Sequence, residues 1–184
     1  MRCFIVFIML VLPDFSSAQH DLIAIEGDTT YMQKAEILYG ENKPLYRWML
    51  KKSAPDGYWK IYRDKYKKML SSEGKIKGGK RDSVWVRYDK KGRKAVEMIY
   101  LNGFLNGQEV YFNTRTNSKL MIYTYKNGIK NGPYVIYHAN GVKWEEGSFR
   151  NGVPNGEWKS WNKEGKLIHT RYYQDGSLVK EQLF

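Results

Sequence analysis

Glycine recurs through this chain at a nearly fixed spacing, and that spacing limits the fold more than any other feature. An Asp or Asn followed by Gly or Ser opens five copies of one pattern, whose second residues lie at 57, 83, 107, 132 and 156. The period is therefore 24 to 26 residues. A second glycine series lies four residues ahead of most of these positions. Together the two series supply the turn glycines that we expect to be structural: Gly103, Gly107, Gly128, Gly132, Gly152, Gly156 and Gly176.

Each copy has the pattern of two strands. The second strands are predicted at 95–101, 120–126, 143–150 and 167–174, and each ends at Asn-Gly or Asp-Gly, the strongest short-range hairpin signal. The turn inside the second, fourth and fifth copies holds a glycine, and Asn117 fills that slot in the third copy because Asn also tolerates positive φ. The first copy is degraded and lacks this glycine. Gly or Pro recurs too often to leave room for helices of about ten residues. The sequence predicts an all-β repeat array of stacked antiparallel hairpins that form one elongated twisted sheet.

The array is predicted to cover residues 45–184, with residues 19–44 as an N-terminal cap. Leu45 to Lys52 has the pattern of the second strand of a half-copy, and Ser53 takes the glycine slot. Residues 30–39 fit either a short helix or an edge strand that closes the array, because the end of a repeat stack needs a cap.

Two aromatic slots recur in the first strand of the copies. The slot five residues after each copy start is aromatic in every copy, so we expect its rings to pack between hairpins: Tyr62, Tyr88, Phe112, Tyr137 and Trp161. The slot two residues after the start holds Trp59, Trp85, Tyr134 and Trp158, but Glu109 in the third copy. A slot that accepts Glu is expected to be partly solvated, which favours a binding role for its rings.

Charge is unevenly distributed. The chain has 31 Lys and Arg against 19 Asp and Glu, a net charge of +12, and lysine is concentrated in the first half of the array. A solvated face that keeps an aromatic sheet soluble is one interpretation. The other is an electrostatic surface for anionic lipid, an anionic glycan or an acidic protein. On the second interpretation Trp59, Trp85, Lys67 and Lys91 form the binding surface.

The first 18 residues have the pattern of a secretory signal peptide. Arg2 is followed by an apolar run from Cys3 to Leu12, and Ser16 and Ala18 supply small residues at the cleavage site. The run is shorter than the roughly 20 residues that span a bilayer as a helix. We therefore expect cleavage after Ala18 and export to the periplasm, outer envelope or exterior. The mature chain would lack Cys3, the only cysteine, as suits an oxidising compartment.

Residues that carry enzyme chemistry form no recognisable constellation in this sequence. His138 and His169 have no second His or Cys at metal-ligand spacing, and Glu145 and Glu146 are adjacent in a strand, so they point to opposite faces. No phosphate loop, dinucleotide fingerprint or nucleophile elbow occurs. The sequence predicts no catalytic residues, no metal site and no cofactor, and export argues against a nucleic-acid partner.

The pattern Tyr-x-Asn-Gly-x-x-x-Gly-x-Trp-x-x-Tyr resembles the MORN-repeat variant family and is most similar to the YwqK-type antitoxins of toxin–antitoxin systems. The resemblance covers about residues 45–180 and is strongest from Tyr100 to Gly176. It implies stacked hairpins in one long sheet, with roles in protein binding, scaffolding or association with membrane lipid. This chain differs from a cytoplasmic antitoxin in that its N-terminus has the pattern of an export signal.

These observations predict an exported, non-enzymatic binding or scaffolding protein that acts through protein–protein contacts. Two alternatives remain open. One is an antitoxin or immunity protein that neutralises a toxin partner, and the other is a peripheral envelope protein that docks on anionic lipid.

Overall fold

The computed structural model describes residues 22–25, 32–37, 45–51, 54–64 and 66–184. Within these ranges all the regular structure is β-strand. The predicted signal peptide lies outside the described residues, as do most of the residues between 19 and 44.

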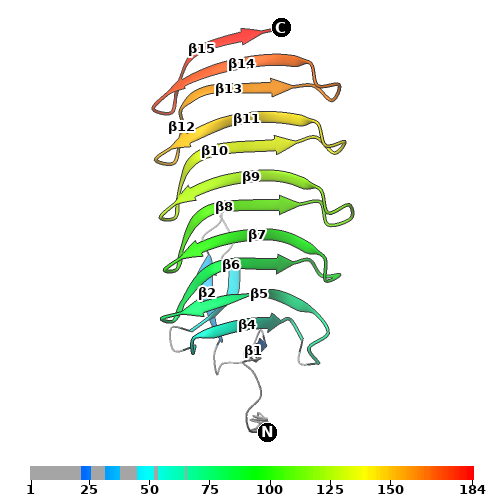
Figure 1. The fold of residues 1–184 in the computed structure, drawn as a ribbon, viewed down its shortest axis with the longest axis vertical. Helices are drawn as coiled ribbons and strands as arrows, with labels where there is room; N and C mark the ends of the chain where they lie inside the picture. The colour runs from blue at the N-terminus through cyan, green and yellow to red at the C-terminus, as the bar shows by residue number, and fades with distance from the viewer. Residues whose placement is uncertain (1–21, 26–31, 38–44, 52–53, 65) are drawn as a thin grey trace, which may run out of the picture.

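One sheet dominates the molecule. Figure 1 shows its strands stacked as an elongated, twisted single layer, and the sheet has 13 strands. From β4 onward, consecutive strands of the sheet pair antiparallel, with β12 as a short side branch on β11. The all-β hairpin array predicted from the sequence is thereby confirmed. Its strands are β4 (Gly57–Tyr62), β5 (Leu70–Lys77), β6 (Lys80–Tyr88), β7 (Lys94–Leu101), β8 (Phe104–Phe112), β9 (Lys119–Lys126), β10 (Ile129–Tyr137), β11 (Lys143–Arg150), β12 (Val153–Pro154), β13 (Gly156–Trp161), β14 (Leu167–Gln174) and β15 (Ser177–Leu183), together with β1 (Leu22–Ile25).

The turns alternate between the two long edges of the sheet (Figure 1). We call one the glycine edge; its turns lie at 78–79, 102–103, 127–128, 151–152 and 175–176. At residues 102–103 both positions have positive φ, 52° for Asn102 and 88° for Gly103, the geometry of a tight hairpin turn whose twist matches its strands. The opposite edge is the Asx edge, where Asp64, Asp89, Asn113 and Asn162 accept backbone N–H bonds in the turns they begin. Asn117 takes φ of 56° there, as predicted for the copy that lacks a turn glycine.

Successive turns on the glycine edge are joined by backbone hydrogen bonds. The amide of Gly103 donates to the carbonyl of Arg81 at 2.8 Å, and that of Gly128 donates to Leu105 at 2.8 Å. Gly152 and Gly176 repeat the bond one and two copies further on. On the Asx edge the links between copies come from side chains instead. Arg63 donates to the carbonyls of Tyr88 and Asp89, and His138 Nε2 lies 2.8 Å from the Trp161 carbonyl oxygen.

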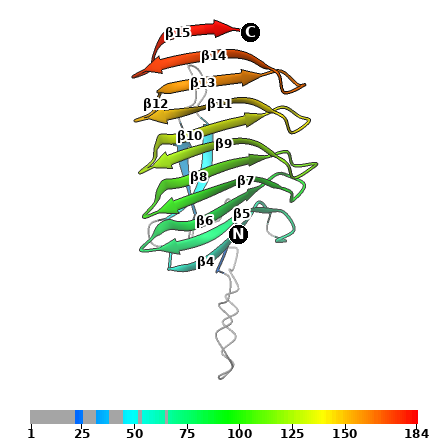
Figure 2. The ribbon, with the colours of Figure 1, turned by 45° about the horizontal axis from the view of Figure 1, so that its top comes forward.

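The N-terminal strands depart from the array. β1 pairs parallel with β4 and so caps that end of the sheet. β2 (Met32–Ile37) and β3 (Leu45–Leu50) pair only with each other, as a separate two-stranded sheet. The prediction that residues 45–52 form the second strand of a half-copy is therefore wrong, and so is the helical alternative for residues 32–37. Figures 1 and 2 both place this hairpin behind the main sheet, and Figure 1 shows it at the level of β4–β7.

Candidate functional site: the tryptophan face

One face of the main sheet carries the slot that begins with Trp59, and we call it the tryptophan face. Alternate residues of a strand point to opposite faces, and directly paired residues share a face. The strand registers therefore place one row of side chains across the whole sheet, which we call the tryptophan row. In strand order it comprises Trp59, Gly74, Trp85, Met98, Glu109, Tyr123, Tyr134, Gly147, Trp158 and Arg171.

Two glycines in this row make room for indole rings. A Cβ atom at Gly74 would lie 2.4 Å from Cδ2 of Trp85, and one at Gly147 would lie 2.2 Å from Cδ2 of Trp158. These distances are far shorter than any van der Waals contact, so each ring lies flat on the neighbouring backbone. The row thus alternates its largest residue with its smallest at both places, so that each ring packs directly against the neighbouring strand.

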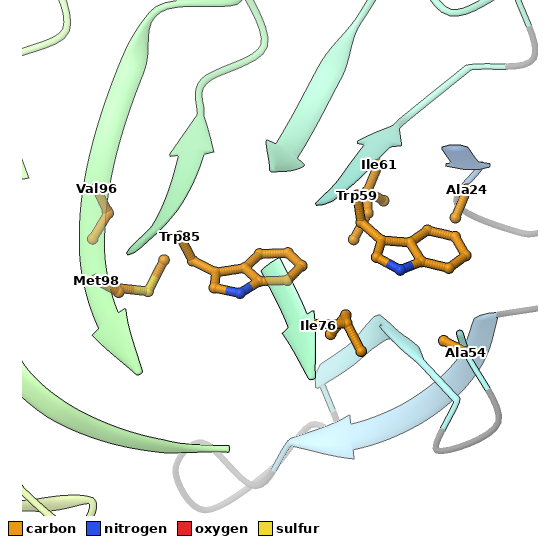
Figure 3. Packing of buried hydrophobic residues seen from close by; sticks show 8 residues of the cluster. All are labelled: Ala24, Ala54, Trp59, Ile61, Ile76, Trp85, Val96 and Met98. Carbon is orange, nitrogen blue, oxygen red and sulfur yellow. The ribbon is translucent and has the colours of Figure 1, made fainter. Parts of the chain in front are cut away.

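The N-terminal part of the face is a closed core. Trp59 is 1% exposed and Trp85 0%, and both belong to a buried cluster with Ala24, Ala54 and Ile76. Figure 3 shows both indoles and Ile76 on the side of the main sheet that faces a pale blue strand of the N-terminal region. Each indole N–H is satisfied by a carbonyl, Pro55 for Trp59 and Lys75 for Trp85, both at 2.9 Å. This part of the face, on β4–β7, is the covered half.

The predicted binding surface is therefore wrong in its aromatic residues, because Trp59 and Trp85 are the most completely buried large side chains among the described residues. Lys67 and Lys91 are exposed, but they lie in turns of the Asx edge. The structure therefore does not place these lysines on one exposed surface with Trp59 and Trp85. Sequence reasoning placed a strand at 45–52 in the array and an end cap at 30–39, so it did not predict that the two segments pair as a hairpin over these tryptophans.

The aromatic slot five residues after each copy start was expected to form the packed core, but its rings are not fully buried. Tyr62, Tyr88, Phe112, Tyr137 and Trp161 are all half-buried rather than core residues. Each lies three positions after its partner in the tryptophan slot, so it points to the other face. Two of these rings contact long side chains of neighbouring strands: Lys94 Nζ lies 4.1 Å from the Phe112 ring centroid, and Tyr88 donates its hydroxyl to Glu73. The prediction that this slot forms the packed core is wrong for that reason.

Beyond β8 the tryptophan face has a different composition, and we call β9–β14 the open half. A cluster of rings replaces the core: Trp158 lies 5.2 Å from both Tyr134 and Phe149 by ring centroid, and 5.8 Å from Tyr173. Tyr123 lies 5.0 Å from Tyr134. Figure 1 draws no strand of the described part of the chain behind β9–β14. The indole N–H of Trp158 is buried without a hydrogen-bond partner there, unlike those of Trp59 and Trp85.

Charged groups surround the ring cluster. Lys130 Nζ lies 3.7 Å from the centroid of the Tyr123 ring. Arg171 pairs with Glu145 through Nη2, and Ser160 Oγ donates to Glu145 at 3.2 Å. These contacts leave the open half with rings and paired charges, a mixture typical of protein interfaces.

Glu109 stands in the tryptophan row at the boundary between the two halves, and it is 9% exposed. The expectation that this slot is solvated is wrong. Side-chain hydrogen bonds from Tyr111 and Tyr125 take the place of water around its carboxylate. Burial, reinforced by the nearby Glu109 charge, raises the pKa of Tyr111 to about 12 and raises that of Tyr125 also. Both tyrosines therefore stay protonated and act as donors at neutral pH.

The remaining candidates for chemistry lie apart. His138 contacts the Trp161 carbonyl and stacks on Trp144 at 5.7 Å, and His169 Nε2 lies 2.5 Å from Glu181 Oε1. No group of three or more His, Cys, Asp and Glu side chains among the described residues is arranged to hold a metal ion. No helix long and apolar enough to cross a membrane occurs in the same part of the chain.

The chain was compared with protein-family models and with curated proteins. The chain matches no family model, and no curated protein is significantly similar to it.

Proposed function

We propose that this protein is a non-enzymatic binding or scaffolding module, and that the open half of the tryptophan face is its surface for a protein partner. One observation carries the proposal. The same face is covered by a β-hairpin at one end of the sheet, and at the other end it carries a ring cluster over which no described strand lies. Trp158 and Tyr134 in this cluster are only 6% and 9% exposed, whereas Tyr123, Phe149 and Tyr173 are half-buried. Aromatic residues that stay partly exposed are concentrated at protein–protein contacts.

The chemistry of the covered half indicates what the partner presents. There the chain lays two antiparallel strands across the indoles. In the open half the tryptophan row again holds aromatic residues and a glycine. A partner β-hairpin with aliphatic side chains could therefore lie over these rings, as β2 and β3 lie over the covered half. The rings supply apolar area, while the Arg171–Glu145 pair and Lys130 supply polar contacts at the margin.

Matched pairs of variants on one pair of strands test this proposal. Met121 and Ile136 are cross-strand partners on the open half, and Ile122 and Val135 are partners on the opposite face of the same two strands. All four side chains are half-buried. Replacing the first pair with Lys should weaken partner binding at least about 30-fold, because two charges would be buried at the contact. The second pair should leave affinity within about threefold.

The measurement is quantitative capture from the native envelope, followed by titration of the captured protein against each variant. Thermal melting ensures that only folded variants are compared. The proposal would be contradicted if both pairs of variants lost the same affinity for the captured protein, or if neither pair changed that affinity.

We also propose that the protein is exported, with cleavage after Ala18. The apolar run from Cys3 to Leu12 and the small residues Ser16 and Ala18 support this proposal. N-terminal sequencing of the protein from the producing cell should give Gln19 as the first residue. An intact Met1 on protein recovered from the cytoplasm would refute it.

A further inference from the structure

One aromatic ring per copy lies on the reverse face of the main sheet, opposite the tryptophan face, and the proposed function does not use these rings. Each ring stands near the Asx edge and is half-buried, so part of its surface is open to solvent. Figure 1 draws the covering hairpin behind the main sheet, on the side away from these rings. We call the five residues the ring row: Tyr62, Tyr88, Phe112, Tyr137 and Trp161.

The rings lie in one line along the length of the sheet. Tyr88 is paired directly with Lys94 across its hairpin, and directly paired residues share a face. The same lysine reaches the ring of the next copy, because Lys94 Nζ lies 4.1 Å from the Phe112 ring centroid. Lys143 and Trp161 repeat this contact further along the array, at 5.9 Å. One lysine thus stands between successive rings and links them into a continuous row.

The spacing of the ring row follows from the geometry of the sheet. The rings stand on every second strand, since each belongs to the first strand of its copy. Neighbouring strands are about 4.8 Å apart, so successive rings repeat at about 9.6 Å. One disaccharide of an extended β-1,4-linked glycan has nearly this length. The flat face of a pyranose ring carries C–H groups that pack against aromatic rings. One ring per copy therefore matches every second sugar of such a chain.

Two of the three lysines that stand between rings are paired with carboxylates. Lys94 Nζ lies 2.7 Å from Glu97 Oε2, and Lys143 Nζ lies 2.7 Å from Glu146 Oε2. These pairs offer hydrogen-bond donors and acceptors beside the rings with little net charge, which suits the hydroxyl groups of an uncharged sugar. A surface for an anionic ligand would instead present unpaired cations.

An exposed indole widens the ring row toward its C-terminal end. Trp144 is 49% exposed. Glu145 pairs directly with Ser160. Trp144 precedes the first of these residues and Trp161 follows the second, so the two indoles face each other across adjacent strands on the reverse face. His138 stacks on the Trp144 ring at 5.7 Å. Two adjacent indoles make this end the widest part of the row.

From this geometry we infer that the ring row binds an uncharged, extended β-1,4-linked glycan, which lies along the sheet and across its strands. The sugar rings stack on the aromatic side chains, while the Lys–Glu pairs bond the sugar hydroxyl groups. A proline-rich peptide has a similar repeat, about 9.3 Å for each turn of three residues, but it offers the Lys–Glu pairs no hydroxyl groups. This surface is separate from the open half, which lies on the other face.

Calorimetric titration of the full chain with cello-oligosaccharides tests the inference. Affinity should rise about threefold to tenfold with each disaccharide added from cellobiose to cellohexaose, the gain from one further ring contact. Maltohexaose, whose α-1,4 linkages curve the chain, should bind at least about tenfold more weakly than cellohexaose, because it cannot follow a straight row of rings. The affinity for cellohexaose should change less than about twofold between low and high salt, since the sugar carries no charge.

Variants inside and outside the row show whether the rings are responsible. Trp144→Ser changes an exposed side chain and should weaken cellohexaose binding about fivefold, and adding Trp161→Leu should bring the loss to at least about tenfold. Phe104→Leu is the matched control, because it removes a 57% exposed ring from the same face at the glycine edge. It should leave the affinity within about twofold of wild type. A thermal melt checks the fold of each variant.

Three results would overturn the inference: no binding of cellohexaose, equal binding of maltohexaose, or equal losses from Trp144→Ser and Phe104→Leu. Binding of a proline-rich peptide in place of cellohexaose would also overturn it and would assign the row to a peptide. The Lys pair at Met121 and Ile136 should leave glycan binding unchanged, and Trp144→Ser should leave capture of the protein partner unchanged. The two proposals can therefore fail separately.

Discussion

The covered and open halves of the tryptophan face use the same repeat slots in different surroundings. In the covered half the indoles of Trp59 and Trp85 are fully buried and donate to carbonyls. In the open half Trp158 is held mainly by other rings, and its N–H has no partner in the described part of the chain. The position of a residue in the repeat therefore determines to which face its side chain points. How deeply that side chain is buried depends on whether another segment of the chain covers the face.

Removing an indole from either half is expected to have the largest effect on stability, and the two losses can be compared directly. Trp85→Ala should lower the free energy of unfolding by about 4–5 kcal/mol, because the covering hairpin prevents the site from collapsing. Trp158→Ala should cost about 3 kcal/mol, since neighbouring rings can relax into the space. Urea unfolding of both variants measures the difference. A Trp158→Ala loss equal to or larger than that of Trp85→Ala would break the distinction between the halves.

A smaller effect comes from the glycines beneath the rings. Gly74→Ala should cost about 3 kcal/mol, because the added methyl group would overlap Trp85, whose ring is held from both sides. Gly147→Ala should cost about 1–2 kcal/mol, because Trp158 can move away from the sheet. Ser148→Ala, the next position on β11, serves as the control and should change stability by less than about 1 kcal/mol. Equal costs at the two glycines would argue that the open half is as tightly packed as the covered half.

The smallest expected effect concerns the boundary at Glu109. Tyr111 has a folded-state pKa of about 12, above the ordinary value near 10, so its protonated form stabilises the fold fully below pH 10. That contribution should be lost as pH rises from about 10 to 12, and Tyr125 should act in the same direction. Tyr111→Phe should cost about 1–2 kcal/mol at pH 7, by removing a donor to a buried carboxylate, and should flatten the alkaline limb.

Stability measured from pH 8 to 12 checks this expectation. Tyr172, a half-buried tyrosine that donates an exposed hydrogen bond to Glu157, provides a control, and Tyr172→Phe should leave most of the alkaline loss in place. If Tyr111→Phe left the profile unchanged, the two hydroxyls would not be what accommodates Glu109.

The repeat architecture was predictable from sequence because its signals are local. Turn glycines and Asn-Gly pairs specify hairpins without reference to distant residues, and the predicted strand 143–150 coincides with β11. The choice of buried face was not predictable. It depends on β2 and β3, because β3 has the pattern of a second strand of the array and yet pairs with β2 instead. It also depends on Gly74 and Gly147, whose slot holds Met98, Tyr123 and Arg171 in the other copies. The burial of Glu109 was not predictable for a related reason. Its tyrosine partners lie on the same strand and on a neighbouring strand, and not in its own repeat slot.

The hydrogen bonds between turns on the glycine edge have a consequence for how such a chain can change in length. Donor and acceptor are both main-chain atoms, so the joint between one copy and the next does not depend on which side chains the two copies carry. Any copy with a left-handed Gly in that turn offers the same amide to its predecessor. Duplication or deletion of a whole period would therefore preserve this joint, whereas the Asx edge would need a new side-chain donor such as Arg63 or His138 each time.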